Sequence, residues 1–342
     1  MSLSFLLEAP VALLPALAFL IVLDRLDSFR LVSLRAAIVT LAAGGTLAFA
    51  SYFANAGAMD ALGFDIRTYS RYGAPVVEET LKAAVMIYLF QRARIGFLID
   101  AAIMGFAIGT GFAFVENLYY LYTFPEANLG VWIVRGFGTA MMHGGTTAIF
   151  GVLSQAWTER HTKFEPALYL PGLAAAIVIH SLFNHLLATP MVATAAMLLL
   201  VPAALFVVFA KSEHKIHDWL IKDHADHERL LATMSIEFAH SEAGRFVAEL
   251  ADKFKGADTT DIYAYMRLHA ELVLRAEDLL LARSSGTKPA ITPDDRAKFA
   301  ILHELERKIG KTAFLALWPH LHYSREELAE LYELESRTRH HA

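Results

Sequence analysis

The chain has 342 residues with a formal net charge of −5, and 56% of its residues are hydrophobic while 19% are charged. This composition excludes an ordinary soluble enzyme and leaves room for a membrane domain followed by another domain, and the absence of a long basic run gives no case for nucleic-acid binding. The sequence contains no cysteine, which excludes disulfides, thiolate nucleophiles and thiolate metal ligands and leaves carboxylate, imidazole and hydroxyl chemistry.

Charged residues are unevenly distributed along the chain. Residues 1–210 contain 11 of the 30 Lys and Arg residues and 12 of the 35 Asp and Glu residues, which leaves 19 basic and 23 acidic side chains for residues 211–342. We therefore predict a transmembrane domain over residues 1–210 and a soluble α-helical domain over residues 211–342.

Seven apolar segments are candidate membrane spans, because a helix needs roughly 17 to 25 mostly apolar residues to cross a hydrocarbon core about 30 Å thick. They cover residues 3–23, 34–55, 73–90, 97–122, 131–156, 167–188 and 190–210. The predicted fold is all-α: a polytopic membrane helix bundle of about seven spans with a C-terminal soluble helical domain.

Basic residues in short loops predict the orientation, since they favour the cytoplasmic side. They follow the first, third, fifth and seventh segments, for example at Arg25, Arg92 and Lys211, whereas the loop over residues 123–130 has none. The pattern predicts an outside N-terminus and a cytoplasmic C-terminal domain. One missed or re-entrant segment would reverse the position of that domain.

The C-terminal domain has the amphipathic pattern of soluble helices. Hydroxyl residues at Thr259, Thr292 and Ser324 are typical helix starts, the last with Glu327 as a capping-box partner. Eleven of the 15 histidines lie in this domain, including His214, His217, His224 and His227. Their pattern is more typical of solvated helix faces and a juxtamembrane surface than of a metal site.

The third apolar segment carries three ionisable residues, Glu78, Glu79 and Lys82. Charges in hydrocarbon cost at least about 2.5 to 3.5 kcal/mol each, so they mark a functional site that faces the interior of the bundle. On a helix Lys82 lies three and four positions from the two carboxylates and is able to neutralise either of them.

Three further segments carry polar residues that a lipid-facing surface would not tolerate. These residues are Glu116 and Asn117 on the fourth segment, His143 on the fifth, and His180 and Asn184 on the sixth. A single Asn or His in a span is often a contact between helices. Their combination, at similar depths in the predicted outer half of the bilayer, predicts one shared polar pocket.

Two kinds of chemistry fit this set of side chains. A buried glutamate could activate water for hydrolysis, with His180 and Asn184 donating hydrogen bonds to an oxyanion. Alternatively Glu79, Glu116, His143 and His180 could bind zinc, with one carboxylate kept as the base. The sequence does not choose between the two.

These motifs resemble the PrsW family of intramembrane proteases, which is similar to the larger superfamily of CAAX-processing and Abi-type membrane proteases. The segment from Glu78 to Lys82 fits the E-E-x-x-K motif, and the segment from Phe112 to Asn117 fits the F-x-x-x-E-N motif. The fifth-segment His143 and the pair of His180 and Asn184 complete the match. The resemblance covers about residues 70–190.

The resemblance implies a multi-helix enzyme of a bacterial cytoplasmic (inner) membrane that cleaves a single-span membrane protein, as family members do with anti-sigma factors. By analogy with the CAAX branch, Glu78 or Glu79 would activate water, and His180 with Asn184 would form the oxyanion hole. That branch has a histidine where this chain has Glu116, so His143 would supply the missing imidazole. The implied mechanism is either metal-dependent, with zinc, or metal-free, and no other cofactor is expected.

Two other classes of protein remain as alternatives. A proton-coupled transporter or channel would use the same Glu and His residues as a proton relay, although no inverted repeat is evident in the sequence. A non-catalytic membrane scaffold would keep the motifs without the activity. The pattern favours the protease, and it says nothing about the oligomeric state.

Overall fold

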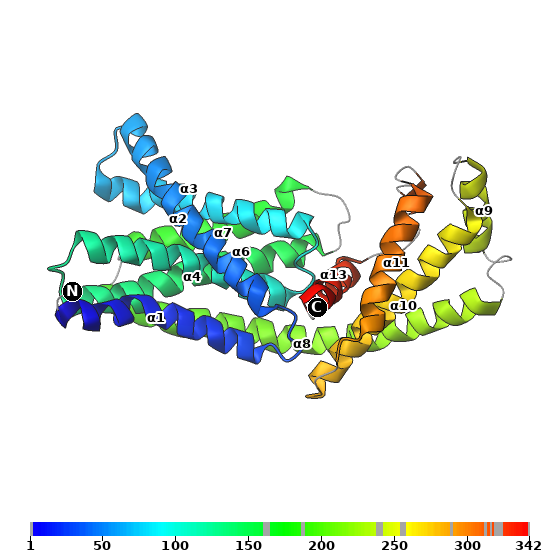
Figure 1. The fold of residues 1–342 in the computed structure, drawn as a ribbon. Coiled ribbons are helices and arrows are strands. Elements are labelled where there is room, and N and C mark those ends of the chain that lie inside the picture. Colours follow the sequence, from blue (N-terminus) through cyan, green and yellow to red (C-terminus); the bar gives the residue numbers. More distant parts are fainter. Residues whose placement is uncertain are drawn as a thin grey trace. The chain divides into compact units, whose positions relative to one another are not determined.

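The computed structural model describes residues 3–159, 165–185, 189–236, 242–253, 258–287, 290–310, 313–314, 317 and 324–340. These residues contain helices and no strand, which confirms the predicted all-α polytopic bundle. The chain divides into two compact units, Met1–Ser212 and Glu213–Ala342 (Figure 1). Lys211, where the charge composition changes, is the next-to-last residue of the first unit.

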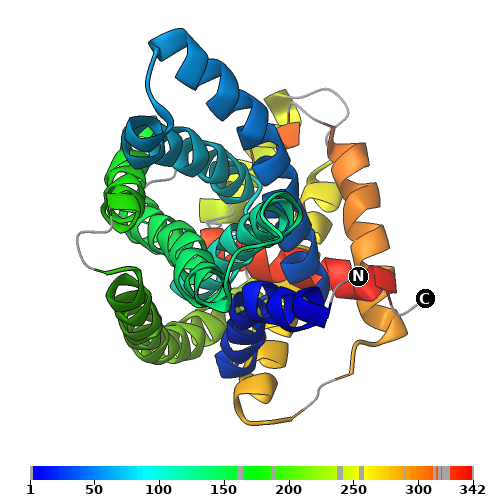
Figure 2. The ribbon, with the colours of Figure 1, turned by 90° about the vertical axis from the view of Figure 1, so that its left-hand side faces the viewer.

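Helices cover all seven apolar segments of the first unit, apart from residues 186–188, which lie outside the described residues. In chain order they are α1 (Leu3–Leu26), α2 (Leu34–Leu62), α3 (Ile66–Gln91), α4 (Leu98–Thr123), α5 (Leu129–Ile133), the π-helix η1 (Val134–Thr139), α6 (Ala140–Thr158), the 3₁₀ helix η2 (Pro166–Tyr169), α7 (Leu170–His185) and α8 (Pro190–Ile236). Figure 2 looks nearly along several of these helices.

Five of the helices in the described residues are long and apolar enough to cross a membrane, fewer than the seven expected. They are α1, α2, α4, α7 with η2, and α8. Helix α3 falls outside this group because any stretch of it long enough to cross a membrane contains three charged residues, Glu78, Glu79 and Lys82. Helix α6 is short and carries polar residues such as His143 and Gln155. Five spans are therefore supported by composition, and the spanning of α3 and α6 stays a prediction.

The outward faces of the apolar helices are covered by large hydrophobic side chains. Leu7 on α1, Ile38 on α2, Leu182 on α7 and Leu199 on α8 are all more than half exposed. Contiguous apolar surface of this kind is rare on soluble monomers and is typical of a surface that faces lipid. The first unit is thus the membrane domain of an integral, multi-pass membrane protein.

Helix α4 forms the centre of the first unit. Every residue from Ile99 to Ala113 is buried, and the helix packs mainly against α6 and α2. The packing is close because glycines remove side chains from the contact: a methyl group at Gly109 would overlap with the carbonyl oxygen of His143, and one at Gly111 with the carbonyl oxygen of Leu41. The α4–α6 contact therefore brings the backbone of α6 next to α4 at the position of His143.

The second unit contains the residues of α8 from Glu213 onward, α9 (Glu242–Lys253), α10 (Thr259–Ser284), α11 (Pro293–Ile309) and α13 (Arg325–His340). Helix α10 packs against α9, α11 and α13. The core of this unit includes Leu250, Ile262, Leu272, Leu279, Phe299 and Leu302. The unit is a small helical bundle with an apolar interior of its own.

Two of the three predicted helix starts of this unit have the expected caps. The Thr292 hydroxyl accepts from the Asp295 amide N–H, and Ser324 and Glu327 exchange hydrogen bonds between side chain and backbone in both directions. The expected hydroxyl cap at Thr259 was wrong, because the carboxylate of Asp258, one residue earlier, accepts from the Thr260 amide and caps α10.

We expect Gly109→Ala to destabilise the first unit by about 1–3 kcal/mol, since an added methyl group forces α4 away from α6. The measurement is the midpoint of thermal unfolding in detergent. Gly57→Ala on α2 is the control, because no atom lies within 4 Å of a methyl group at that position. Equal midpoints for the two variants would contradict the close contact between α4 and α6.

Candidate active site

Helix α3 contributes three ionisable side chains to the interior of the first unit. The helix starts at a carboxylate cap, since Asp65 accepts from the Arg67 and Thr68 amides. Glu78, Glu79 and Lys82 lie on its buried face. Buried charges are tolerated only when partners compensate them, so their partners indicate the role of each residue.

Lys82 is the most enclosed charge of the site, with a side chain that is 0% exposed. Its Nζ lies 2.6 Å from Glu79 Oε1, 3.1 Å from His143 Nδ1 and 4.9 Å from the centre of the Phe112 ring. Three helices, α3, α6 and α4, therefore supply its partners. The ammonium group is fully used by these contacts, and Glu79 is its counter-ion.

Glu79 determines which nitrogen of His180 carries the proton. His180 Nδ1 lies 2.7 Å from Glu79 Oε1, and Thr146 Oγ1 donates to the same oxygen over 3.3 Å. Because a carboxylate that is paired with Lys82 only accepts hydrogen bonds, the proton lies on His180 Nδ1. Nε2 of His180 is then the nitrogen with the free lone pair.

Lys82 sets the opposite arrangement in His143. Its ammonium group only donates hydrogen bonds, so His143 Nδ1 accepts and Nε2 carries the proton. That Nε2 lies 3.3 Å from Glu116 Oε2. The two imidazole rings contact each other edge to face, with centres 4.9 Å apart. Coordination of a metal through His143 Nε2 would require the proton to leave that nitrogen.

Glu116, near the end of α4, forms an ion pair with Arg135 on η1. Arg135 Nη2 lies 3.0 Å from Glu116 Oε2, and the carboxylate is 24% exposed, more than the other charged groups of the cluster. The guanidinium group also stacks 3.6 Å from the centre of the Tyr120 ring. These contacts hold Glu116 in the ionised form at an accessible position.

Asn117 positions this pair and does not face the other polar groups. Its Oδ1 accepts from Arg135 Nε over 2.8 Å, and its Nδ2 donates to the carbonyl oxygen of Ala12 on α1 over 2.8 Å. Arg135 itself lies on the π-helix η1, a wider turn of the kind that often occurs at functional sites. Asn117 thus fixes Arg135 and joins α4 to α1.

Glu78 has a different environment from its neighbour Glu79. Its Oε1 accepts from Asn55 Nδ2 over 3.0 Å, and Asn55 in turn accepts from the Tyr69 hydroxyl. Its Oε2 lies 4.0 Å from His180 Nε2. Within the described residues no lysine or arginine forms an ion pair with Glu78, so this carboxylate lacks the counter-ion that Glu79 has.

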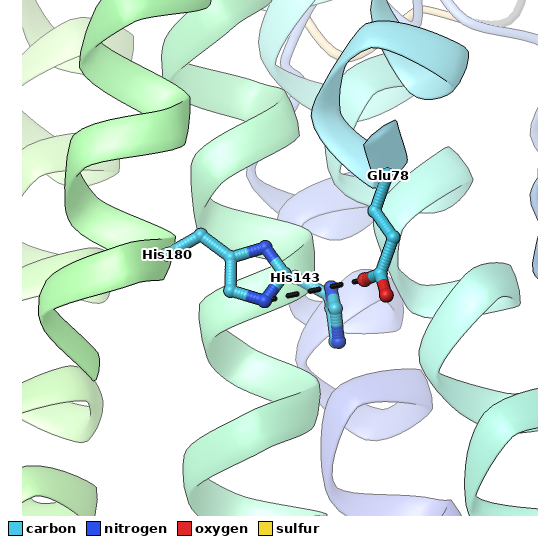
Figure 3. Close-up of side chains that lie close together, drawn as sticks. All are labelled: Glu78, His143 and His180. Atoms are coloured by element: carbon cyan, nitrogen blue, oxygen red, sulfur yellow. Dashed lines mark ion pairs between the residues drawn. The ribbon is translucent and has the colours of Figure 1, made fainter. Parts of the chain in front are cut away.

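Glu78, His143 and His180 form a group that fits a metal ion. One ligand atom from each lies within 4.8 Å of the others, and all three residues are buried. Figure 3 shows the two rings and the carboxylate converging, with the contact between Glu78 and His180 drawn as a dashed line. Two imidazoles and one carboxylate are a common ligand set of catalytic zinc. The second nitrogen of His180 is already bound by Glu79, as is usual for histidines that bind metals.

A cavity of about 1310 Å³ opens beside this group. Glu78, Glu116, His143 and His180 line it, together with Arg135, and neither Glu79 nor Lys82 does. The remaining wall is mostly aromatic and apolar and includes Phe49, Tyr52, Phe53, Phe112, Tyr119 and Tyr120. Two carboxylates and two imidazoles of the cluster therefore line the cavity, and Glu79 and Lys82 lie behind them.

Six of the eight residues singled out from the sequence meet in one cluster: Glu78, Glu79, Lys82, Glu116, His143 and His180. Asn117 lies behind Arg135, and Asn184 donates to the carbonyl oxygen of Ser70 while it lines the cavity. Sequence reasoning overlooked Arg135 and Asn55 as members of the site. The presence of an arginine inside an apolar segment was the available signal for the first, since such a charge needs a partner.

Comparison with known proteins places the chain in a family. Residues 32–210 match the family model described as PrsW family intramembrane metalloprotease. Searches of curated proteins and of solved structures gave no significant match.

We expect Lys82→Met to destabilise the first unit by about 3–5 kcal/mol, because it leaves the Glu79 carboxylate buried without its counter-ion. The double variant Glu79→Gln, Lys82→Met should lose clearly less than the sum of the two single variants, and thermal unfolding of all three measures this. Lys298→Met, at a surface pair with Asp294 in the second unit, is the control and should change stability by at most about 1 kcal/mol. Additive losses would show that Glu79 and Lys82 do not depend on each other.

Proposed function

The chain belongs to the PrsW family of intramembrane metalloproteases, and we propose that it is an endopeptidase that hydrolyses a peptide bond of a single-span membrane protein. The observation that carries this proposal is the cavity that Glu78, Glu116, His143 and His180 line together. Two carboxylates and two imidazoles that line one cavity suit the activation of a water molecule against a carbonyl group.

The cavity is larger than a small ligand or ion needs, and its size suits a stretch of peptide. Its volume of about 1310 Å³ exceeds the roughly 300–1,000 Å³ that is usual for small-ligand pockets. Aromatic residues of α2 and α4 cover its apolar wall, among them Phe53 and Tyr119. An extended stretch of a transmembrane substrate could bury its side chains against this wall, with its backbone close to the polar groups.

Glu78, His143 and His180 are the residues that we propose to hold a zinc ion, which would replace the proton on His143 Nε2 and release it to solvent. In this assignment Glu78 takes the place of Glu79 in the ligand set expected from the sequence. Glu79 already contacts Lys82 Nζ and His180 Nδ1 through its Oε1. Glu79 then orients His180 from behind, and Lys82 keeps Glu79 ionised. A bound zinc ion would supply Lewis acidity and lower the pKa of a bound water to about 7.

Glu116 is the carboxylate that remains as the general base. It lines the cavity, lies 3.3 Å from His143 Nε2 and is kept ionised by Arg135. It takes a proton from the attacking water as the oxygen of that water bonds to the peptide carbonyl carbon. The proton then passes to the leaving nitrogen as the C–N bond breaks, so that the carboxylate is restored.

Arg135 is our candidate for stabilising the oxyanion. Its guanidinium group lines the cavity and is the cation nearest to Glu116. Asn184, which the sequence suggested for this task, already donates from Nδ2 to the carbonyl oxygen of Ser70. In this proposal Asn184 instead fixes the end of α7 against the start of α3.

The cellular setting that we propose is a bacterial cytoplasmic membrane, with the N-terminus outside and the second unit in the cytoplasm. The basic residues that follow alternate segments support this orientation. A proton-coupled transporter remains the alternative, because the same Glu and His groups would relay protons. Cleavage and ion flux, both measured with the purified chain in vesicles, separate the two.

We expect Glu78→Gln to abolish cleavage of a single-span substrate in proteoliposomes, with at least a 100-fold loss of rate, since it removes one of the three proposed metal ligands. Folding should be kept, because the amide can still accept from Asn55. Glu126→Gln, at an exposed position between α4 and α5, is the matched control and should cleave normally. Wild-type cleavage by Glu78→Gln would remove Glu78 from the mechanism.

Removal of metal should abolish cleavage as well. We expect the purified protein to contain zinc or a similar divalent ion, to lose cleavage after prolonged chelation, and to regain it when zinc is restored. Metal content by mass spectrometry and cleavage rate, measured on the same sample, provide the check. Full activity in a sample without metal would favour the metal-free alternative, with Glu78 as the base.

A further inference from the structure

A second group of acidic and histidine side chains lies inside the second unit, away from the family motifs. Asp223 and His227 are one turn apart on α8, Glu277 lies on α10, and Glu327 lies on α13. One ligand atom from each of Asp223, His227 and Glu327 lies within 4.8 Å of the others. His227 Nδ1 is also 2.9 Å from Glu277 Oε1.

Four buried atoms of this group, on three of its residues, lack hydrogen bonds. The Glu277 side chain is 0% exposed, and neither of its oxygens has a hydrogen-bond partner, although one lies beside His227. Asp223 Oδ2 and His227 Nδ1 are buried without hydrogen bonds as well. Burial of the Glu277 carboxylate is costly, because it has lost its water and has gained no hydrogen bond and only His227 as a charged neighbour.

These carboxylates also have few positively charged neighbours. Within the described residues no lysine or arginine forms an ion pair with Asp223, Glu277 or Glu327, and His227 is the basic side chain that faces them. Burial and the nearby charge of Asp223 together raise the pKa of Glu327 to about 7. The cluster thus has an excess of negative charge that a cation would relieve.

We propose that Asp223, His227, Glu277 and Glu327 form a site for one divalent transition-metal ion, such as Zn²⁺ or Mn²⁺, that joins α8, α10 and α13. Carboxylate and imidazole donors suit these ions, and the chain has no thiolate to favour softer ones. Donor atoms bound to one zinc ion lie roughly 3.5 Å apart. Small rotations of these side chains would bring their donor atoms from the present separations to that distance. One Glu327 oxygen accepts from the Ser324 amide, which fixes that side chain and leaves the other oxygen for the metal.

This site is separate from the proposed zinc site of the first unit, and its purpose is structural. Its four residues lie on helices, which position ligands more firmly than loops do. A metal there holds together three elements that are far apart in the sequence. The second unit should therefore become more stable when the metal binds.

The test uses the full-length chain in detergent, stripped of metal and reloaded with Zn²⁺ or Mn²⁺ alone. We expect Glu277→Gln to bind one metal ion per chain fewer than the wild type. His224→Gln is the matched control, because His224 lies on the same helix and pairs with exposed Asp278 outside the cluster. Equal metal content in the wild type and Glu277→Gln would overturn the proposal.

Two further measurements keep the result independent of the protease site and of folding. In a Glu78→Gln background, Glu277→Gln should still remove one metal ion per chain. Added metal should raise the unfolding midpoint of the second unit in the wild type and not in Glu277→Gln. If that variant fails to fold, Asp223→Asn, at a half-buried position, replaces it in both measurements. A midpoint that does not respond to metal in the wild type would also overturn the proposal.

Discussion

The ion pair between Glu79 and Lys82 is the contact on which the candidate active site depends. Lys82 is fully enclosed and has partners on α3, α4 and α6, and Glu79 extends the network to His180 on α7. Each link determines a proton position, because a paired carboxylate only accepts and an ammonium group only donates. The pair therefore decides which nitrogen of each histidine faces the cavity, although it takes no part in the cavity wall itself.

The glycine contact between α4 and α6 makes this network geometrically feasible. His143 reaches Lys82 and Glu116 because its backbone lies against Gly109, where a larger residue would not fit. Arg135 reaches Glu116 from the wider turn of η1, which directly precedes α6. Close packing and a local change of helical pitch together bring the polar side chains of separate helices to one place.

The helical fold and the meeting of the Glu and His motifs could be predicted from the sequence, because charged residues in apolar segments indicate a buried polar site. The choice between Glu78 and Glu79 could not, since both lie one turn from Lys82 and only the contacts of Asn55 and His180 distinguish them. Asn184 could not be placed either, because its partner is a backbone carbonyl that carries no sequence signal. The cluster at His227 was likewise hidden, since its residues come from helices far apart in the chain.

The two adjacent glutamates of α3 also differ in their exposure to chemical attack. Glu78 lines an apolar cavity, and Glu79 lies behind it, with Lys82, Thr146 and His180 around its carboxylate. A lipid-soluble reagent that activates carboxyl groups would reach the first and be kept from the second. Two neighbours in the sequence would thus differ in their reactivity towards the same reagent. Covalent inhibitors of this protein would have Glu78 and Glu116 as their targets.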